Sequence, residues 1–194
     1  MLLSPSEIDR SITETVVGAR TDVATTIAQI VTTTGNTLFL TAVVVVAAIV
    51  FTVRRAYAEA TLIGVGSLVG YLLMVGLKNL VARPRPPVAD RLIDIDTFSF
   101  PSGHAMMSMI VYCLLGAALY RTVFWVRAHP TVLLIAPVWS VAIGCTRVYL
   151  GVHWTTDVVA GWLIGAAWVA LCLWLCRRWA TVAATARPPV RAGR

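Results

Sequence analysis

Charged residues are scarce in this sequence. Asp, Glu, Lys and Arg make up 13% of its 194 residues, while hydrophobic residues make up 58%. A soluble domain carries roughly 25% charged and about 45–50% apolar residues. The deficit excludes a disordered chain, a nucleic-acid-binding module and an ordinary cytosolic enzyme. A chain of this length and composition is predicted to be a single domain embedded in a lipid bilayer.

Cysteine is scarce too. The four cysteines all lie in apolar stretches, so we expect buried thiols rather than disulfides or metal ligands. The net charge of +7 is spread between apolar runs and forms no basic patch for nucleic acid. No secretory signal peptide is expected, because Glu7, Asp9 and Glu14 interrupt the place where its apolar core would lie.

Most of the sequence consists of long apolar runs without charged residues. A helix needs about 20 apolar residues to cross a bilayer. We predict spanning helices at about 37–53, 60–78, 103–120, 131–147 and 156–176. The predicted fold class is therefore all-α: an integral-membrane helical bundle formed by one domain, residues 1–194. Pairs of glycines four residues apart are typical of close packing between its helices: Gly66 with Gly70, and Gly161 with Gly165.

The N-terminal segment, at about 5–33, differs from the five spans. Ser4, Pro5 and Glu7 form a helix start signal, and apolar residues then recur every three or four positions from Ile8 to Ile30. This pattern predicts one amphipathic helix, which either lies on the membrane surface or packs as a sixth span. At the other end, a basic tail at about 180–194 is expected to be mobile.

Arginines outside the spans predict the orientation of the bundle. One side holds Arg54, Arg55, Arg121, Arg127, Arg177, Arg178, Arg187, Arg191 and Arg194. Because cytoplasmic loops are enriched in Arg and Lys, we assign this side to the cytoplasm. The opposite side, which is then extracytoplasmic, holds Lys78, Arg83, Arg85, Arg91 and Arg147.

Polar residues that are costly in a membrane gather at the extracytoplasmic end. Separate stretches deliver them: Lys78 and Arg85 after the second span, Ser102, Gly103 and His104 at the start of the third, and Arg147, His153 and Asp157 between the fourth and fifth. The lysine and the two arginines bring positive charge that suits phosphate oxygens. The Pro-Ser-Gly-His stretch forms a helix N-terminus, which favours anions. The cluster therefore predicts a site for phosphate or diphosphate.

Two histidines and one carboxylate supply candidate catalytic groups. His153 and Asp157 are four residues apart and share one face of a helix. A carboxylate at one imidazole nitrogen fixes the tautomer and leaves the other nitrogen free as a nucleophile. His104 is placed to protonate a leaving oxygen. No metal-ligand set is evident, so neither a metal nor another cofactor is expected. Arg83 and Arg91 lie on either side of Arg85 in the same loop and are candidate contacts to a second phosphate.

Three motifs occur in order along the chain. They read Lys78-NLVARP-Arg85-Pro86, Pro101-Ser102-Gly103-His104 and Thr146-Arg147-VYLGV-His153-WTT-Asp157. Together they resemble the signature of the type 2 phosphatidic acid phosphatase (PAP2) superfamily, which also includes vanadium haloperoxidases. The resemblance covers residues 78–157 and the helices around them. One position departs from the family pattern, because Thr146 stands where the family has serine; its hydroxyl can still bind phosphate.

The resemblance implies metal-free hydrolysis of phosphate monoesters or diphosphates. His153 would attack phosphorus to form a phosphohistidine, Asp157 would orient His153, and His104 would protonate the leaving group. The phosphoryl oxygens would be held, and the transition state stabilised, by Lys78, Arg85, Ser102, Gly103 and Arg147, with Thr146 as a further candidate.

The sequence thus predicts a multi-pass lipid phosphatase of the cell (inner) membrane, with its active site on the extracytoplasmic face. Its expected partners are the bilayer and a membrane-lipid substrate, not nucleic acid; the oligomeric state stays open. Family analogy favours polyprenyl diphosphate, and phosphatidylglycerol phosphate, phosphatidic acid and a prenyl-linked sugar phosphate remain open. The alternatives from other classes are a phospholipid-binding transporter and a haloperoxidase. A transporter is expected to place charges at the bilayer midplane, whereas here they gather at one edge, and haloperoxidases of the family are largely soluble.

Overall fold

The structure is a computed structural model that describes residues 4–185, with side chains described through Trp179. Within this range all regular elements are helical: α1 (Glu7–Gly18), α2 (Asp22–Thr33), α3 (Thr37–Val53), α4 (Tyr57–Val81), η1 (Val88–Asp90), α5 (Gly103–Thr122), α6 (Phe124–Ala128), η2 (Pro130–Leu134), α7 (Ile135–Tyr149) and α8 (Thr155–Thr185). This confirms the all-α fold class. The tail predicted at 180–194 is helical as far as Thr185, and its remainder, 186–194, lies outside the described residues.

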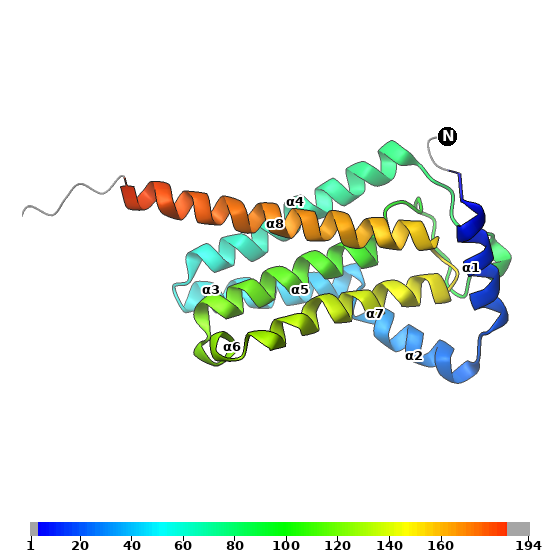
Figure 1. Cartoon of the computed structure of the whole chain (residues 1–194), viewed down its shortest axis with the longest axis horizontal. Coiled ribbons are helices and arrows are strands. Elements are labelled where there is room, and N and C mark those ends of the chain that lie inside the picture. The colour runs from blue at the N-terminus through cyan, green and yellow to red at the C-terminus, as the bar shows by residue number, and fades with distance from the viewer. Residues whose placement is uncertain (1–3, 186–194) are drawn as a thin grey trace, which may run out of the picture.

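Five segments of the described chain are long and apolar enough to cross a membrane, as the sequence predicts. They are Asp22–Val53, Tyr57–Val81, Gly103–Thr122, Pro130–Tyr149 and Thr155–Trp179. The first joins α2 to α3, and the fourth joins η2 to α7. Figure 1 shows that α3, α4, α5, α7 and α8 run side by side along the long axis of the molecule. They form the predicted bundle.

Helix α5 lies at the centre of the bundle and packs against α3, α4, α7 and α8. Its side chains Met106, Ile110 and Leu114 are fully buried. Glycines let the neighbouring helices approach closely. A Cβ on Gly70 of α4 would lie 2.8 Å from the Ile110 side chain, and one on Gly165 of α8 would lie 2.8 Å from the Met106 carbonyl oxygen. These glycines therefore serve close helix packing, as their spacing predicts.

The prediction of a single helix over about 5–33 is wrong, because this segment forms two helices, α1 and α2. The Thr21 hydroxyl oxygen accepts a hydrogen bond from the first turn of α2 and caps it. The Arg20 side chain turns away to donate hydrogen bonds to the backbone carbonyls of Tyr149 and Asp90. A cap and two contacts to remote segments thus outweigh the continuous apolar period.

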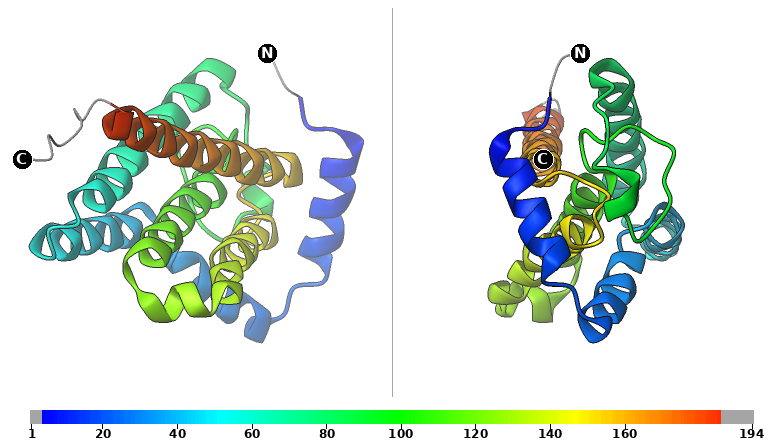
Figure 2. Two further views of the ribbon diagram at one scale, coloured as in Figure 1. Left: turned by 60° about the vertical axis from the view of Figure 1, so that its left-hand side comes forward. Right: turned by 90° about the vertical axis from the view of Figure 1, so that its right-hand side faces the viewer.

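Helix α1 lies across one end of the bundle, as both views of Figure 2 show. Its 12 residues rise about 1.5 Å each and give about 18 Å, short of the roughly 30 Å of a hydrocarbon core. Of the two alternatives, α1 therefore matches the surface-lying helix rather than a sixth span. It also starts later than predicted: Ser6 is its N-cap and forms a capping box with Asp9, so Ser4, Pro5 and Glu7 are not its cap.

Helix α2 turns its apolar stripe outward. Val23, Ile27 and Ile30 are exposed on the surface of the bundle, where lipid would contact them, whereas Ala28 and Thr32 are buried. The buried face packs against α7. Helix α2 therefore exposes much of its apolar stripe and packs on the bundle through a narrow face that holds Ala28 and Thr32.

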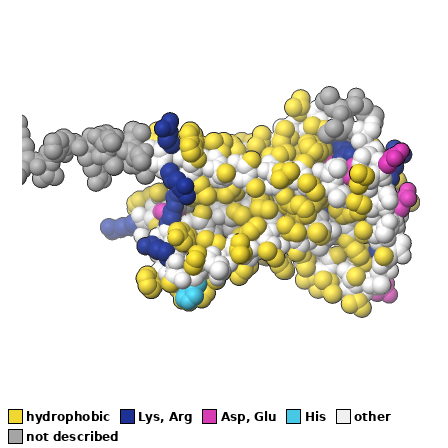
Figure 3. Space-filling model, in the orientation of Figure 1, with side chains coloured by type: hydrophobic (Ala, Val, Ile, Leu, Met, Phe, Trp, Pro, Cys, Tyr) yellow, Lys and Arg dark blue, Asp and Glu magenta, His cyan; other side chains and the backbone are white. Residues whose placement is uncertain are grey.

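Charged side chains lie at both ends of the bundle. On the face that Figure 3 shows, Lys and Arg side chains lie mainly at the end where α3 meets α4, and Asp and Glu side chains lie mainly at the end that α1 covers. Arg54 and Arg55 connect α3 to α4, and Arg121 and Arg127 belong to α5 and α6. The predicted site residues lie at the α1 end, away from these arginines.

Candidate active site

Six of the predicted site residues line one cavity near the α1 end of the bundle, with a volume of about 630 Å³. They are Lys78 in the last turn of α4, Arg85 in the loop that follows, Gly103 and His104 in the first turn of α5, Arg147 in the last turn of α7 and His153 in the loop before α8. The structure thus brings together residues that are widely separated in sequence.

A tight turn positions the loop that carries His153. Gly151 has a φ of +70°, in the left-handed region that glycine adopts without a steric penalty. A Cβ at Gly151 would also collide with the Asp90 carbonyl oxygen. The loop between α7 and α8 therefore packs directly against the loop after α4, which carries Arg85.

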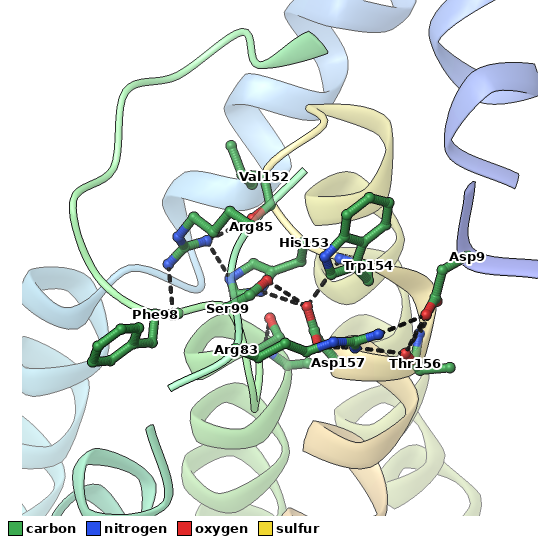
Figure 4. A network of polar contacts seen from close by, with 12 residues as sticks. Asp9, Arg83, Arg85, Phe98, Ser99, Val152, His153, Trp154, Thr156 and Asp157 are labelled. Carbon is green, nitrogen blue, oxygen red and sulfur yellow. Dashed lines mark hydrogen bonds and ion pairs between the residues drawn. The ribbon is translucent and has the colours of Figure 1, made fainter. Parts of the chain in front are cut away.

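His153 and Asp157 are buried side by side (Figure 4). Nδ1 of His153 lies 3.6 Å from Oδ2 of Asp157. The same carboxylate oxygen accepts hydrogen bonds from the Ser99 hydroxyl, at 2.5 Å, and from the Trp154 backbone nitrogen, at 3.0 Å. A carboxylate beside Nδ1 favours the tautomer that carries its proton there, and this tautomer leaves a lone pair on Nε2.

The imidazole of His153 is neutral at pH 7. Burial lowers its pKa well below 6.5, and the positive charges of Arg85, Lys78 and Arg147 lower it further. The unprotonated Nε2 lies 3.1 Å from Nη1 of Arg85 and can accept a hydrogen bond from it. A neutral ring with its lone pair turned toward a cation is suited to attack an electrophile that the same cation binds.

Arg85 and Lys78 both reach the loop that precedes α5 (Figure 4 shows Arg85). Arg85 donates hydrogen bonds to the backbone carbonyls of Thr97 and Phe98, and Lys78 Nζ donates to the same Phe98 carbonyl at 2.6 Å. Burial and the charge of Arg91 lower the pKa of Arg85 to about 10, so its guanidinium stays charged at pH 7. Two cations thus converge on one side of the cavity.

Arg147 brings a third cation from α7. It is 2% exposed, and its Nη1 donates a hydrogen bond to the Thr32 hydroxyl of α2 at 2.8 Å. Its Nε has no hydrogen-bond partner in the described part of the chain. Arg147 lines the cavity, and a guanidinium in that position is suited to bind a phosphate oxygen.

Two predicted phosphate contacts do not line the cavity. Ser102 is fully buried, and its hydroxyl oxygen caps α5 by accepting a hydrogen bond from the Ala105 backbone. The Thr146 hydroxyl donates to the Ile143 carbonyl at 2.6 Å. Consecutive residues of a helix point about 100° apart. Because Arg147 lines the cavity, its neighbour Thr146 faces elsewhere.

Arg83 does not line the cavity, contrary to the expectation that it contacts a second phosphate. It is 3% exposed and lies between two carboxylates: Nη1 is 2.5 Å from Asp157 and Nη2 is 2.8 Å from Asp9 of α1. Figure 4 shows this bridge next to His153. Arg91, the other flanking arginine, donates to the Pro86 carbonyl.

Ser99 and Asp9 are site neighbours that the sequence analysis misses. A serine in a loop carries no signal of its own. Asp9 offers a faint one, since it recurs with Thr13 on one face of α1, and both are buried there. The carboxylate that completes the surroundings of Arg83 comes from 74 residues earlier in the chain, so a motif confined to the loop could not indicate it.

The other half of the cavity is apolar. Its lining side chains are Leu40 and Val44 of α3, Leu68, Tyr71 and Val75 of α4, and Met107 and Val111 of α5. Helices α3 and α4 meet at their short connection and diverge toward the site end in Figure 1. An apolar cavity between membrane helices that ends at a cluster of cations fits an amphiphile with an anionic head.

The positive charges that face the cavity are carried by the side chains of Lys78, Arg85 and Arg147. Among the described residues, no group of three or more His, Cys, Asp or Glu is arranged to hold a metal ion.

Comparison with known proteins relates this chain to phosphatases. The model of the PAP2 superfamily matches residues 59–180. Phosphatidylglycerophosphatase B of Bacillus subtilis is 41% identical over 95 residues, which cover 48% of this chain and 46% of that protein. Decaprenylphosphoryl-5-phosphoribose phosphatase of Mycobacterium tuberculosis is 31% identical over 115 residues, 58% of each chain. The chain thus spans about half the length of the curated relatives it matches.

A solved structure is similar over a longer range. The crystal structure of a transmembrane PAP2-type phosphatidylglycerolphosphate phosphatase from Bacillus subtilis matches with a TM-score of 0.83 at 30% identity, over 88% of this chain and 85% of that one. Together with the five apolar segments, this similarity makes the chain a multi-pass membrane protein.

Proposed function

The chain belongs to the PAP2 superfamily, and from this premise we propose that it is a membrane phosphatase that hydrolyses a phosphate or diphosphate on a lipid head group. The observation that carries the proposal is the cavity, which joins three cations and His153 to apolar walls from α3, α4 and α5. A lipid would place its phosphorylated head among the cations while its tail lies along the apolar walls.

Phosphate binding would rearrange the cations of the cavity. Arg85 and Lys78 donate to backbone carbonyls of Thr97 and Phe98, and a charged phosphate oxygen is a stronger acceptor than a carbonyl. Arg85 would transfer donors to the phosphate and release Nε2 of His153, to which it lies 3.1 Å away. The substrate would thus expose the nucleophile that attacks it.

The first chemical step transfers the phosphoryl group to the protein. The lone pair of His153 Nε2 forms a bond to phosphorus as the bond from phosphorus to the leaving oxygen breaks. His104, which lines the same cavity, donates a proton to that oxygen. Asp157 stabilises the positive charge that develops on the imidazole, and the cations stabilise the charge on the phosphoryl oxygens.

The second step returns the protein to its starting state. A water molecule attacks the phosphohistidine, with His104 accepting its proton, and the bond from nitrogen to phosphorus breaks. Inorganic phosphate leaves, and His153 is again neutral. Because Lys78, Arg85 and Arg147 supply the positive charge, we propose that no metal ion takes part.

The proposed site faces the extracytoplasmic side of the membrane. Arg54, Arg55, Arg121 and Arg127 lie in the α3–α4 connection, at the end of α5 and in α6, which are at the opposite end of the bundle, and Arg and Lys are enriched in cytoplasmic loops. A lipid head group in the outer half of the bilayer would then lie level with the cation cluster.

Two lipid classes are the leading substrates. Polyprenyl diphosphate is the prediction from the sequence. Phosphatidylglycerol phosphate is supported by the names of the curated relative and of the crystal structure from Bacillus subtilis, which describe that activity.

Phosphate release from the protein in detergent micelles, with EDTA present, tests the proposal. The substrates are undecaprenyl diphosphate, phosphatidylglycerol phosphate and phosphatidic acid, and His153→Ala is measured beside His129→Ala. His129 is an exposed histidine at the other end of the bundle and serves as the matched control. We expect turnover that His153→Ala abolishes and His129→Ala retains. Hydrolysis of none of the lipids, or activity of His153→Ala near that of the wild type, would contradict the proposal.

A further inference from the structure

We propose that Asp9, on the N-terminal helix α1, is a positioning residue for the active site: through Arg83 it sets the orientation and the effective charge of Asp157, and thereby the reactivity of His153. This inference rests on the proposed function. Its basis is the chain of contacts that Figure 4 shows from α1 to the imidazole.

Asp9 is fully buried although it belongs to a helix at the end of the bundle. Its Oδ1 accepts a hydrogen bond from the Thr156 backbone nitrogen at 3.0 Å, and its Oδ2 accepts one from the Thr156 hydroxyl at 2.8 Å. Thr156 immediately precedes Asp157. The Asp9 carboxylate thus holds the first turn of α8, from which Asp157 projects.

Arg83 connects the two carboxylates with different nitrogens. Nη2 contacts Asp9 and Nη1 contacts Asp157, while Nη1 also donates to the Thr156 hydroxyl at 2.7 Å. The guanidinium is planar and rigid, so a carboxylate at one nitrogen fixes where the other nitrogen points. Asp9 therefore determines the direction from which Arg83 approaches Asp157.

The charge of Asp9 matters as much as its shape. His153 faces Lys78 of α4, Arg85 of the following loop, Arg147 of α7 and His104 of α5, and Asp157 is the carboxylate beside it. Arg83 competes with His153 for that carboxylate. Asp9 engages the same guanidinium and weakens its hold on Asp157, which leaves more negative charge on the oxygen that faces Nδ1.

Asp9→Asn is the test, because asparagine keeps the shape and one acceptor oxygen of aspartate but removes its charge. Arg83 would then pair more strongly with Asp157, and His153 would become less basic. We expect kcat for phosphatidylglycerol phosphate in detergent micelles to fall by about tenfold, an effect typical of residues that orient a functional side chain from behind. The KM should stay within about twofold, since no cation of the cavity changes. The acid limb of the kcat/KM profile should move to lower pH, because the pKa of His153 falls further.

Glu7→Gln on the same helix is the matched control, since it removes the same charge from an exposed position. A purely structural role for Asp9 would reduce the yield of folded protein but leave kcat and the pH profile of the folded fraction unchanged. That result would overturn the inference.

Arg83→Lys gives a second route if Asp9→Asn does not fold. Lysine keeps the positive charge but lacks the planar fork, so we expect kcat to fall again with little change in KM. Where both single variants fold, their effects should be less than multiplicative in Asp9→Asn/Arg83→Lys, because both act through one contact. A wild type that hydrolyses none of the lipids overturns the proposed function together with this inference. Turnover that requires His153 but is indifferent to Asp9 and Arg83 overturns the inference alone.

Discussion

Replacing Arg83 with methionine is expected to lower the free energy of unfolding by about 3–5 kcal/mol, the usual cost of removing one partner of a buried ion pair. Arg83 is 3% exposed, and the two carboxylates it contacts, Asp9 and Asp157, are 0% exposed. Arg83→Met would leave both carboxylates without the guanidinium between them. The Ser99 hydroxyl and the Trp154 backbone nitrogen would still donate to Asp157, which keeps the cost within that range.

Reversible denaturation in detergent micelles measures this loss. The protein contains seven tryptophans, so intrinsic fluorescence reports unfolding without a label. Arg10→Met, on the exposed side of α1, is the control for the removal of a positive charge. A loss for Arg83→Met within about 0.5 kcal/mol of that for Arg10→Met, the range of ordinary surface substitutions, would refute the reasoning.

A double variant separates stranded charge from lost packing. Asp9→Asn removes one of the two carboxylates that Arg83→Met would strand. Arg83→Met should therefore cost less on the Asp9→Asn background than in the wild type, by about 1 kcal/mol or more, as expected for residues in direct contact. Equal costs on both backgrounds would show that Arg83 stabilises the protein through packing and not through charge.

Three further predictions concern the cavity. Thr32→Val removes the hydroxyl that accepts from Arg147 Nη1 and leaves a buried donor without its partner, so we expect the free energy of unfolding to fall by about 1–3 kcal/mol and KM for the lipid phosphate to rise as Arg147 loses its fixed position; an unchanged stability and an unchanged KM would contradict the role of Thr32. Burial holds the pKa of His153 well below 6.5, so its imidazole stays neutral as the pH falls. We therefore expect the acid limb of the kcat/KM profile to lie below pH 6.5. An acid limb at or above pH 6.5, measured over a series of buffers, would contradict neutral His153 as the nucleophile. Thr146→Val should keep kcat and KM within about twofold, since its hydroxyl donates to the Ile143 carbonyl and such a bond contributes only about 1 kcal/mol; a large rise in KM would place Thr146 on the phosphate after all.

The spans and the convergence of the motifs could be predicted because both follow from local properties. A charge-free run of helical length has one stable placement in a bilayer, and α3 occupies the predicted 37–53. Successive spans reverse direction, so the end of one and the start of the next lie on the same side. That rule alone brings Lys78, His104 and His153 to one end of the bundle.

The remaining features depend on contacts between distant segments. The break at Arg20 and Thr21 arises where the Arg20 side chain meets the Tyr149 and Asp90 carbonyls. The burial of Arg83 depends on Asp9, which lies in another helix. A single sequence shows which side chains carry charge but not which remote partner neutralises them. The periodicity of α1 and α2 therefore indicated helix correctly, while their break and their docking could not be inferred.

The motif region, residues 78–157, does not make the site by itself. Arg147 depends on Thr32 of α2 for a hydrogen bond, and Arg83 depends on Asp9 of α1 for one of its two carboxylates. A buried donor that loses its partner costs about 1–3 kcal/mol, so cations held only by the motif region would be less stable in these positions. Gly35 and Thr37, at the junction of α2 and α3, also line the cavity. The N-terminal helices are therefore part of the site's wall and of its charge balance, because they supply the partners that keep buried arginines in place beside a histidine that must remain neutral.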